Sequence, residues 1–480
     1  MTGTEIRKLK ADLAVIGAGS AGLSAAAGAA MLGLSVVLYE KGEMGGDCLN
    51  YGCVPSKALL SAAKAAASVR EASRYGVGAE ITGVDWPAVQ AHVRGAIETI
   101  APVDSQERFE GLGVTVVREH ARFADRKTLV SDTTRTNARR IIIATGSHAF
   151  VPPIPGLEQA GYLTNETIFS VPEQPTHLVI LGGGPIGMEM AQAFNRLGSE
   201  VTLVEMGRVL GMADEAHGRL AADTLREEGV RLLEGHKAER VEKTTTGVRL
   251  IASHDDGELA IEGSHILVAL GRRAVLDGLD LDKGGVDQDG RAIAVKDTLR
   301  SSSNPRVWAL GDVAGMGQFT HLAGWHASVF VRRAFFKSPF AKSSSLPLPA
   351  VTYTSPEVAQ IGLTEAAARE QYGDEVTASA FSFHENDRAI AEGHTKGEAK
   401  LIIRKGKLLG ASIVGDGAGE ILQMVALAMS NGLAVKDLTN FISPYPTRTE
   451  VVKRAASAYF TETVFGPGAR RLVGLLQRIP

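Results

Sequence analysis

The chain has 480 residues, of which 44% are hydrophobic and 22% are charged, and its formal net charge is −3. This composition is typical of a globular enzyme, and the weak negative charge disfavours nucleic-acid binding, which normally needs a basic stripe. No run of about 18 apolar residues occurs, and the first ten residues lack the apolar core of a signal peptide. We therefore expect a cytoplasmic protein without a membrane span, divided into roughly three domains.

The first recognisable unit is a glycine-rich turn near the N-terminus. An apolar run, Leu13–Ile16, precedes Gly17, Gly19 and Gly22, and Glu40 follows about 20 positions later. In such a turn the first glycine bends the chain, the second lets backbone N–H groups approach a pyrophosphate, and the third lets helix pack on strand. The pattern predicts a dinucleotide-binding fold in which Glu40 binds the adenosine ribose.

The only two cysteines of the chain, Cys48 and Cys53, lie together in segment 45–57. Such an isolated pair in a cytosolic protein indicates redox chemistry or metal binding. A regular helix would keep these positions too far apart for a disulfide, because bridged Cα atoms lie within about 7 Å. Gly52 and Pro55 are predicted to supply the break that brings the two thiols together.

The glycine pattern occurs a second time at an offset of 165 residues. An apolar run, Leu178–Leu181, precedes Gly182, Gly184 and Gly187, and Glu205 closes the unit. Two copies in register, each between an apolar run and a helical stretch, carry the full dinucleotide fingerprint rather than an isolated motif.

Two dinucleotide units and one redox-active cysteine pair suggest an electron relay from nicotinamide through flavin to a disulfide. The first unit is followed directly by the cysteines and should bind FAD, and the second should bind NADH. A carboxylate at Glu205 would repel a 2′-phosphate and so favours NADH over NADPH, although nearby Arg208 leaves NADPH open.

Three further apolar runs end in turns, at Ile141–Gly146, Val268–Arg272 and Val307–Asp312. We expect the first to return the chain to the first sheet and the second to be the corresponding strand end of the second domain. The third places Asp312 at the carboxyl end of a strand, where ligands bind in open α/β sheets. The twelve histidines are scattered and indicate no metal site, and we interpret His321 and His326 as packing residues.

The last part of the chain differs in kind, because short strands and turns follow a serine- and proline-rich linker at 343–349. We predict an α+β layer with strands at 350–353, 360–363, 400–404 and 408–414 and a helix at 420–430. Segment 443–450 breaks the chain before a final helix. The basic and apolar tail from Arg470 is predicted to be a short surface helix, with contact to a membrane or a partner as the alternatives.

These motifs resemble, over roughly residues 10–465, the FAD-dependent class I pyridine nucleotide-disulfide oxidoreductases, a family that includes dihydrolipoyl dehydrogenase, glutathione reductase and mercuric reductase. The resemblance implies an α/β fold with two Rossmann-like FAD and NAD(P) domains and a C-terminal α+β dimerisation domain. It also implies a homodimer in which the C-terminal domain completes the partner's active site. The expected boundaries are 1–165 and 284–345 for the FAD domain, 166–283 for the NAD(P) domain and 346–480 for the interface domain.

The resemblance also assigns expected roles to single residues. Cys48 would be the interchange thiol that attacks substrate, and Cys53 the thiol that faces the flavin. Lys57 would lie beside the flavin and pair with Glu189, while Asp312 would bind the ribityl chain. The positions expected at FAD are Gly17, Gly19, Gly22, Glu40, Lys41, Gly46, Thr145, Gly146, Gly311 and Asp312, and those expected at NAD(P)H are Gly182, Gly184, Gly187, Glu205 and Gly271.

The sequence departs from the family pattern at the acid–base position, where disulfide reductases carry a histidine. Tyr445 stands there, and Glu450 keeps the place of the orienting carboxylate. Deprotonating a tyrosine with a pKa of about 10 instead of about 6.5 costs roughly 5 kcal/mol more, so Tyr445 is a poor base but still a hydrogen-bond donor. Asp47 is a second departure, since threonine is commoner there, and its carboxylate would raise the pKa of the neighbouring thiol unless it is turned away.

A tyrosine at this position resembles mercuric reductase, whose metal–thiolate substrate needs less proton transfer. The chain nevertheless lacks the C-terminal cysteine pair and the N-terminal metal-binding domain of mercuric reductases. The leading hypothesis is therefore an NADH-dependent flavoenzyme acting on a small disulfide or a thiol-bound metal. The alternatives are a dihydrolipoyl dehydrogenase acting on a lipoyl carrier and, in another class, a redox sensor or binding subunit without turnover.

Overall fold

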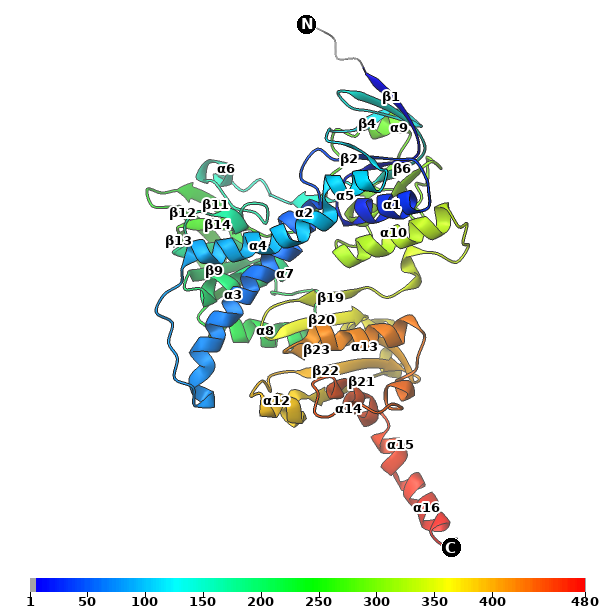
Figure 1. Ribbon diagram of the computed structural model, residues 1–480. Helices are drawn as coiled ribbons and strands as arrows, with labels where there is room; N and C mark the ends of the chain where they lie inside the picture. The colour runs from blue at the N-terminus through cyan, green and yellow to red at the C-terminus, as the bar shows by residue number, and fades with distance from the viewer. Residues whose placement is uncertain (1–5, 480) are drawn as a thin grey trace.

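The computed structural model describes residues 6–479, and its first unit is built on a seven-stranded sheet (Figure 1). The strand order is β3-β2-β1-β6-β5-β4, with β18 paired to β6. The pairs among β1, β2, β3, β6 and β18 are parallel, whereas β4 and β5 are antiparallel additions. The strands are β1 Arg7–Ile16, β2 Val36–Tyr39, β3 Thr115–Val117, β4 Arg122–Asp125, β5 Thr128–Val130, β6 Thr134–Ile143 and β18 Val307–Ala309.

The core of this unit joins two distant parts of the chain. Leu13 and Ile142 are fully buried in the same cluster as Val307 and Phe330. Helices α1 (Ser20–Met31) and α10 (Thr320–Ala334) pack against each other. The prediction that strand 141–143 returns the chain to the first sheet is confirmed, and the apolar run ending at Asp312 adds β18 to the same sheet.

The second unit repeats the parallel architecture on a smaller scale. Its four-stranded sheet has the order β10-β9-β8-β14, and all its pairs are parallel. Because parallel strands are covered on both faces, they are almost continuously apolar, as in β8, His177–Leu181. The other elements are β9 Glu200–Glu205, β10 Arg231–Glu234, β14 His265–Val268, α7 Pro185–Arg196, α8 Glu215–Glu227 and the antiparallel strands β11 Lys237–Lys243, β12 Val248–His254 and β13 Gly257–Gly263.

The C-terminal unit is a five-stranded antiparallel sheet in the order β19-β20-β23-β22-β21. The predicted strands and the helix at 420–430 are present, whereas strand β21 was not anticipated from the sequence. Its elements are β19 Pro349–Thr352, β20 Glu357–Gly362, β21 Val376–Ser382, β22 Glu398–Arg404, β23 Lys407–Gly415, α13 Ala418–Ser430 and α14 Glu450–Ala458. Small elements elsewhere include β7 Ser147–Ala149, which pairs with β15 Arg272–Ala274, and the helices α5 Gln106–Gly111, α6 Leu157–Ala160, α9 Leu281–Gly284, α11 Glu365–Tyr372 and α12 Asp387–Ala391.

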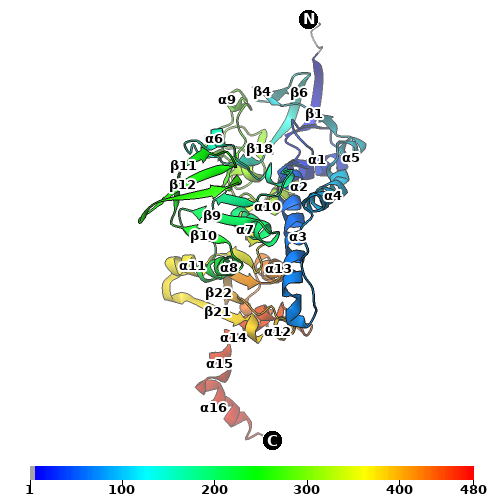
Figure 2. The ribbon, with the colours of Figure 1, turned by 90° about the vertical axis from the view of Figure 1, so that its left-hand side faces the viewer.

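A pair of long helices links the three units. Helix α3 (Cys53–Glu71) begins beside the first unit, contacts α7 of the second and runs down toward the C-terminal sheet (Figures 1 and 2). Helix α4 (Trp86–Asp104) packs along α3. The N-terminus of α3 therefore lies where the first two units meet.

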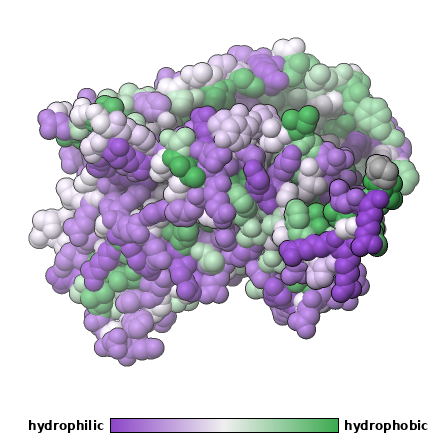
Figure 3. Space-filling view, turned by 90° about the horizontal axis from the view of Figure 1, so that it is seen from below, coloured by the Kyte–Doolittle hydropathy of each residue, from purple (hydrophilic) through white to green (hydrophobic). Residues whose placement is uncertain are grey.

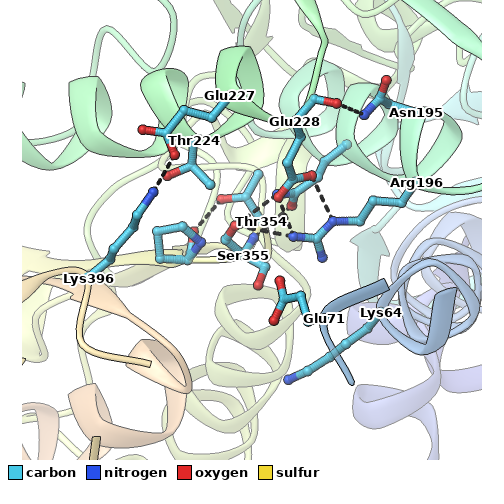
Figure 4. Close-up of polar contacts among 12 residues, drawn as sticks. Lys64, Glu71, Asn195, Arg196, Thr224, Glu227, Glu228, Thr354, Ser355 and Lys396 are labelled. Carbon is cyan, nitrogen blue, oxygen red and sulfur yellow. Dashed lines mark hydrogen bonds and ion pairs between the residues drawn. The ribbon is translucent and has the colours of Figure 1, made fainter. Parts of the chain in front are cut away.

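A polar cluster joins the second unit to the C-terminal unit (Figure 4). Arg196 at the end of α7 forms two hydrogen bonds to Glu228, 2.6 and 2.8 Å long, and its side chain is only 9% exposed. Gln192 donates to the Ser355 carbonyl and accepts from the Ser355 amide, at 2.8 and 2.7 Å. These charge-assisted and backbone contacts fix the approach of the segment before β20 to α7.

The chain ends in two helices that project away from the body, α15 (Thr461–Phe465) and α16 (Pro467–Leu476) (Figure 1). Neither has a buried residue, which confirms the predicted surface helix. The face seen in Figure 3 is mainly hydrophilic, with hydrophobic areas gathered toward its upper and right-hand edges. Within residues 6–479, no helix is both long and apolar enough to cross a membrane.

Candidate active site

The first glycine turn has no room for a side chain at Gly17 or Gly22. Gly17 has a φ of +104°, and a Cβ atom there would lie 2.3 Å from the Ala144 carbonyl oxygen. A Cβ at Gly22 would lie 1.9 Å from the Gly17 oxygen, and one at Gly46 would lie 2.7 Å from the Gly19 Cα. Gly19 precedes α1, and no side chain caps that helix, so its first N–H groups remain open to a pyrophosphate.

The second glycine turn has the same geometry. Gly182 has a φ of +107°, and its Cβ would lie 2.4 Å from the Ala269 carbonyl oxygen. A Cβ at Gly187 would lie 1.9 Å from the Gly182 oxygen, and Gly184 precedes α7 without a side-chain cap. Two helix N-termini in the molecule therefore have the geometry of dinucleotide sites.

The two acidic residues at the ends of these units bind their own glycine turns. Glu40 accepts hydrogen bonds from the amides of Ala18 and Gly42, at 2.6 and 2.7 Å. The same two bonds recur 165 residues later around Glu205, at 2.7 and 2.8 Å. Each carboxylate oxygen keeps a free lone pair for a ribose hydroxyl. The sequence predicted the ribose contact, but the support that each glutamate gives to its turn follows only from the structure.

A cavity of about 60 Å³ lies at the first turn, with Gly17, Glu40, Lys41 and Thr145 in its wall. The Thr145 hydroxyl donates to the Val275 carbonyl at 2.6 Å, which fixes the turn after β6. The cavity lies at the carboxyl ends of β1, β2 and β6, as expected for ligands of open parallel sheets. The Glu40 carboxylate and the uncapped start of α1 suit the ribose and the pyrophosphate of FAD, and the cavity holds only a small part of such a ligand.

A hydrogen-bonded chain connects Asp312 to the segment that carries the cysteines. Ser147 donates to Asp312 at 2.5 Å and accepts from Arg272 Nε at 2.7 Å. Arg272 Nη2 then lies 3.0 Å from Asp47, which also accepts from Asn165 at 2.9 Å. Burial raises the pKa of Asp312, and the Ser147 hydrogen bond opposes that rise. The Asp47 carboxylate is thus paired with a cation.

The turn that carries Asp312 is held by a buried histidine. The Gly311 amide donates to Nδ1 of His326 at 3.1 Å, and Nε2 of His326 lies 2.8 Å from the Ser343 hydroxyl. Burial lowers the pKa of His326 to about 4, so the ring is neutral near pH 7. His326 is the packing residue that the sequence suggested, whereas His321 is exposed, with Nε2 2.9 Å from the Pro349 carbonyl.

The two cysteines lie on successive helices. Cys48 belongs to α2 (Gly46–Asn50), and Cys53 is the first residue of α3; both are free thiols. The helical path is interrupted at Gly52, as predicted, because its φ of −125° and ψ of −106° are not helical. A Cβ there would lie 2.9 Å from the Asp47 side chain. The prediction that Pro55 takes part in the break is wrong. Pro55 is buried in the first turn of α3, where a helix needs no proline N–H.

The surroundings of Cys53 favour its thiolate. A hydrogen bond from Cys48 lowers the pKa of Cys53 to about 6 although burial opposes it, and Thr320 and Lys57 add to the lowering. The Thr320 hydroxyl lies 3.2 Å from Sγ of Cys53, and the N-terminus of α3 contributes in the same direction. The same bond, together with burial, raises the pKa of Cys48.

Lys57 is held one turn further along α3. Its Nζ lies 2.9 Å from Oε2 of Glu189 on α7, a carboxylate with only 6% of its side chain exposed. Oε1 of Glu189 accepts from the Tyr353 amide at 2.9 Å, and Lys57 Nζ lies 4.4 Å from the centre of the Tyr353 ring. Elements from all three units therefore fix one ammonium group near the thiols.

Comparison with known proteins places this arrangement in a family. Residues 11–328 match the family described as pyridine nucleotide-disulphide oxidoreductase, and residues 348–456 match its dimerisation domain. The chain belongs to the pyridine nucleotide-disulphide oxidoreductases. It is accordingly an enzyme of a family that depends on FAD and uses NAD(P)H.

Named members of this oxidoreductase family align over nearly the whole chain. Mercuric reductase from Streptomyces lividans is 36% identical over 463 residues, which cover 94% of this chain and 96% of that protein. Dihydrolipoyl dehydrogenase from Bacillus subtilis (strain 168) is 32% identical, with 92% and 97% covered. The HOCl-induced flavoprotein disulfide reductase RclA from Escherichia coli superposes with a TM-score of 0.82 at 26% identity, covering 93% of this chain and 99% of that chain.

Tyr445 and Glu450, the residues expected at the acid–base position, do not lie beside the cysteines of the same chain. Tyr445 is 70% exposed in the loop before α14, and Figure 1 shows α14 well away from α2. Its hydroxyl donates to Asp387 at 2.8 Å, and this bond raises the pKa of Tyr445. Glu450 lies at the start of α14, 3.6 Å from Arg454. The expectation that Glu450 orients Tyr445 is not met within one chain, where Asp387 makes that contact.

Several groups at the site were missed in the sequence. Arg272 was noted only as the end of a strand, and Ser147 not at all, yet both belong to the chain between Asp312 and Asp47. Thr320 and Tyr353 come from segments distant in sequence from the cysteines. No local pattern marks these four residues, because their neighbours at the site are supplied by other elements.

Proposed function

We propose that this protein takes electrons from NADH and passes them through FAD and the Cys48–Cys53 pair to a thiol-bound metal or a small disulfide, as a mercuric-reductase-like enzyme. The observation that carries this proposal is the position of the Cys53 thiol at the first residue of α3, with the Thr320 hydroxyl 3.2 Å from its Sγ and with Cys48 beside it on α2. A thiolate favoured at neutral pH is the state that a thiol must reach to act as donor or nucleophile.

Bound FAD would supply two-electron transfer from NADH to the disulfide, yielding two thiols. With a disulfide acceptor, Cys48 gives up its thiol proton to solvent and attacks one acceptor sulfur, and the other acceptor sulfur leaves as a thiolate. The Cys53 thiolate then attacks Cys48 in the mixed disulfide, which releases the second acceptor thiolate and restores the Cys48–Cys53 bond. Two electrons reach the acceptor, and its two thiolates take protons from solvent or from a donor group.

Lys57 and Glu189 would place a fixed positive charge beside the thiolate of Cys53. Lys57 Nζ lies 2.9 Å from Glu189, and the Tyr353 amide donates to the other oxygen of this carboxylate. The ion pair therefore holds the ammonium group in one position. The ion pair supports a positioning and electrostatic role for Lys57, whose cation adds to the lowering of the pKa of Cys53.

Preference for NADH is supported at the second glycine turn. Glu205 presents a carboxylate where a 2′-phosphate would have to bind. Arg208, the residue that could have favoured NADPH, points its guanidinium to the carbonyls of Gly211 and Ala213, at 3.3 Å each. Nη2 of Arg208 is thus held by the loop after β9, whereas Nη1 is buried without a hydrogen-bond partner among residues 6–479.

A homodimer in which the C-terminal unit of one chain completes the site of the other accounts for the placement of Tyr445. The C-terminal unit matches a dimerisation domain and exposes large apolar side chains at Leu427 and Ile442, which are 65% and 97% exposed. Tyr445 lies three residues from Ile442 and would reach the partner's Cys48 side as a hydrogen-bond donor. A donor without a base suits a metal–thiolate acceptor better than a reversible dithiol oxidation.

The proposed electron path is tested by anaerobic NADH titration of the FAD-loaded protein. We expect a long-wavelength thiolate-to-flavin absorbance band, and we expect the Cys53→Ala variant to lack it. Absence of the band in the unaltered protein would refute the proposed electron path through Cys53. Steady-state assays with Hg(II), glutathione disulfide and lipoamide then rank the acceptors.

Dihydrolipoyl dehydrogenase remains the second candidate because one such enzyme is 32% identical over 452 residues. It predicts strong turnover with lipoamide, which Tyr445 should restrict. Tyr445→His should raise lipoamide turnover by about tenfold or more, since general bases contribute about 10²–10⁴-fold, while Tyr445→Phe should not. Equal lipoamide rates in the three proteins would contradict the explanation from the lost base.

A further inference from the structure

A cavity of about 520 Å³ on the first unit is surrounded by positive charge, and we call it the basic cavity. Its wall contains two residues of β6, two from the segment before β18, one at the end of α10 and one just beyond it. These cationic residues are Arg139, Arg140, Arg300, Arg306, Arg333 and Lys337. The chain as a whole has a formal net charge of −3, so this concentration of cations is local.

The cations of the basic cavity are largely unpaired with acidic side chains in the described part of the chain. Within residues 6–479, none of the six cations forms an ion pair with a carboxylate. The carboxylate that acts on Arg139 and Arg140 electrostatically is Asp12, and it is hydrogen-bonded to Ser35. Surface arginines usually find a carboxylate or open solvent, so six cations around one concave volume are a recognisable anion site.

The cationic side chains are held by backbone carbonyls rather than left mobile. Arg140 and Lys337 both donate to the Ala334 carbonyl at the end of α10, at 3.2 and 2.8 Å. Arg333 donates to the Ser338 carbonyl at 2.8 Å, and Arg300 donates to its neighbouring loop at 2.6 Å. Groups fixed in this way lose little rotational freedom when an anion binds.

Repulsion among the cations of the basic cavity also favours binding of an anion there. Burial lowers the pKa of Lys337, and the charges of Arg140, Arg139 and Arg300 lower it further. Burial also lowers the pKa of Arg140, with Arg139 adding to the effect. An anion in the cavity would relieve this repulsion, whereas water alone only screens it.

The basic cavity is separate from the cofactor sites. Arg140 pairs with Leu13 inside the sheet, and Arg306 directly precedes β18. The glycine turn at Gly17 follows the end of β1. The four residue steps from Arg140 to Ala144 span about 13 Å at 3.3 Å per residue. A ligand in the cavity therefore would not occupy the dinucleotide site.

We propose that the basic cavity is a second, non-catalytic binding site for a small molecule that carries several phosphate groups, such as a nucleoside triphosphate or tripolyphosphate. Arginine forks bind phosphate oxygens in pairs, and several linked phosphates are needed to match the local charge. The volume lies within the range of small-molecule pockets, about 300–1,000 Å³. A nucleic acid would instead require a basic stripe along a surface.

The test is titration calorimetry on the FAD-loaded protein with NAD⁺ saturating the second glycine turn. Tripolyphosphate should bind one per chain and at least about tenfold more tightly than orthophosphate, a difference of about 1.4 kcal/mol. ATP and GTP are run beside it to separate a nucleotide from a bare polyphosphate. Binding of a 20-nucleotide DNA with an affinity equal to or higher than that of tripolyphosphate would overturn the proposal. Equal affinities for tripolyphosphate and orthophosphate would also overturn it.

Matched variants assign the binding to the basic cavity. The double variant Arg139→Gln/Arg306→Gln should weaken tripolyphosphate binding by about tenfold or more, whereas Arg70→Gln/Arg94→Gln, which neutralises two exposed arginines elsewhere, should not. Lys337→Asn is the second variant, because asparagine tolerates the φ of +57° at this residue. FAD content and the NADH titration should be unchanged in all of them. Equal weakening by the control pair, or no weakening by either cavity variant, would overturn the assignment.

Discussion

Cys53 shows how neighbouring groups set the chemistry of one residue. Its thiolate is favoured by Cys48, Thr320 and Lys57, whereas burial and the nearby Asp47 act against it. Asp47 was expected to raise the pKa of a neighbouring thiol unless it is turned away, and it does act in this direction on Cys53 while Arg272 at 3.0 Å and Asn165 hold its carboxylate. An unusual residue before the first cysteine is thus compensated by a residue from another part of the chain.

The hydrogen bond between the two cysteines can be tested directly. In Cys48→Ala, Cys53 loses its main hydrogen-bond donor, so the pKa of Cys53 should rise above its value of about 6. Cys48→Ser is the matched control, because its hydroxyl can still donate and should keep the pKa low. Each variant retains a single cysteine, so the rate of iodoacetamide alkylation against pH reports Cys53 alone. Identical midpoints in the two variants would contradict this account.

At the scale of elements, α10 and α3 set the geometry of the site. Helix α10 places Thr320 beside Cys53 at its first residue and buries His326 under the turn that carries Gly311 and Asp312. Helix α3 starts at Cys53 and brings Lys57 to Glu189 on α7. The position of each of these site residues is therefore fixed by the packing of the helix that carries it.

Burial of neutral His326 predicts a stability that depends on pH. The unfolded chain takes up a proton near pH 6.5, whereas the folded chain takes it up only near pH 4. The stabilisation is therefore complete above pH 6.5 and is lost as the pH falls toward 4. Between pH 7.5 and 5.0 this residue should lower the free energy of unfolding by about 2 kcal/mol.

Urea unfolding at the two pH values, compared between the unaltered protein and His326→Gln, measures this effect. Glutamine can still accept from the Gly311 amide but does not titrate, so the variant should show a smaller loss of stability at pH 5.0. Other histidines with lowered pKa values, His177 and His265 among them, contribute equally to both proteins. The same loss in both would show that His326 is not responsible.

At the scale of the whole molecule, all three units contribute to one site. Tyr445, the proposed acid–base residue, lies far from that site on the C-terminal unit of the same chain. The glycine turns, the cysteines, Lys57 and Glu189 belong to the body of one chain. Tyr445 lies on the exposed edge of the C-terminal unit, near other exposed apolar residues. Reduction by NADH should therefore not require the dimer, whereas reduction of the acceptor should require it.

Ile442→Lys separates the two halves of the reaction. A lysine at this 97% exposed position should weaken the proposed dimer, which light scattering over a dilution series would detect. The monomer should still give the NADH-driven absorbance change but should lose most of its turnover of disulfide or Hg(II). Met31→Lys, at a 78% exposed position on α1, is the matched control and should remain dimeric. Full turnover by a monomeric Ile442→Lys protein would contradict the shared active site.

The sequence by itself determined the features that depend on local spacing. The glycine turns at Gly17 and Gly182 and the strands before them followed from motifs, because turn geometry and strand burial restrict residue type position by position. The pairing of Lys57 with Glu189 was implied only by the family resemblance. The break between the cysteines was also predicted at Gly52, although Pro55 was wrongly included.

Only the tertiary structure decided which distant groups meet. The chain from Asp312 to Asp47, the contact of Thr320 with Cys53 and the cations of the basic cavity join residues more than a hundred positions apart. Asp387 likewise replaced Glu450 as the partner of Tyr445. Such neighbours depend on how sheets and helices pack, and no short pattern records this packing.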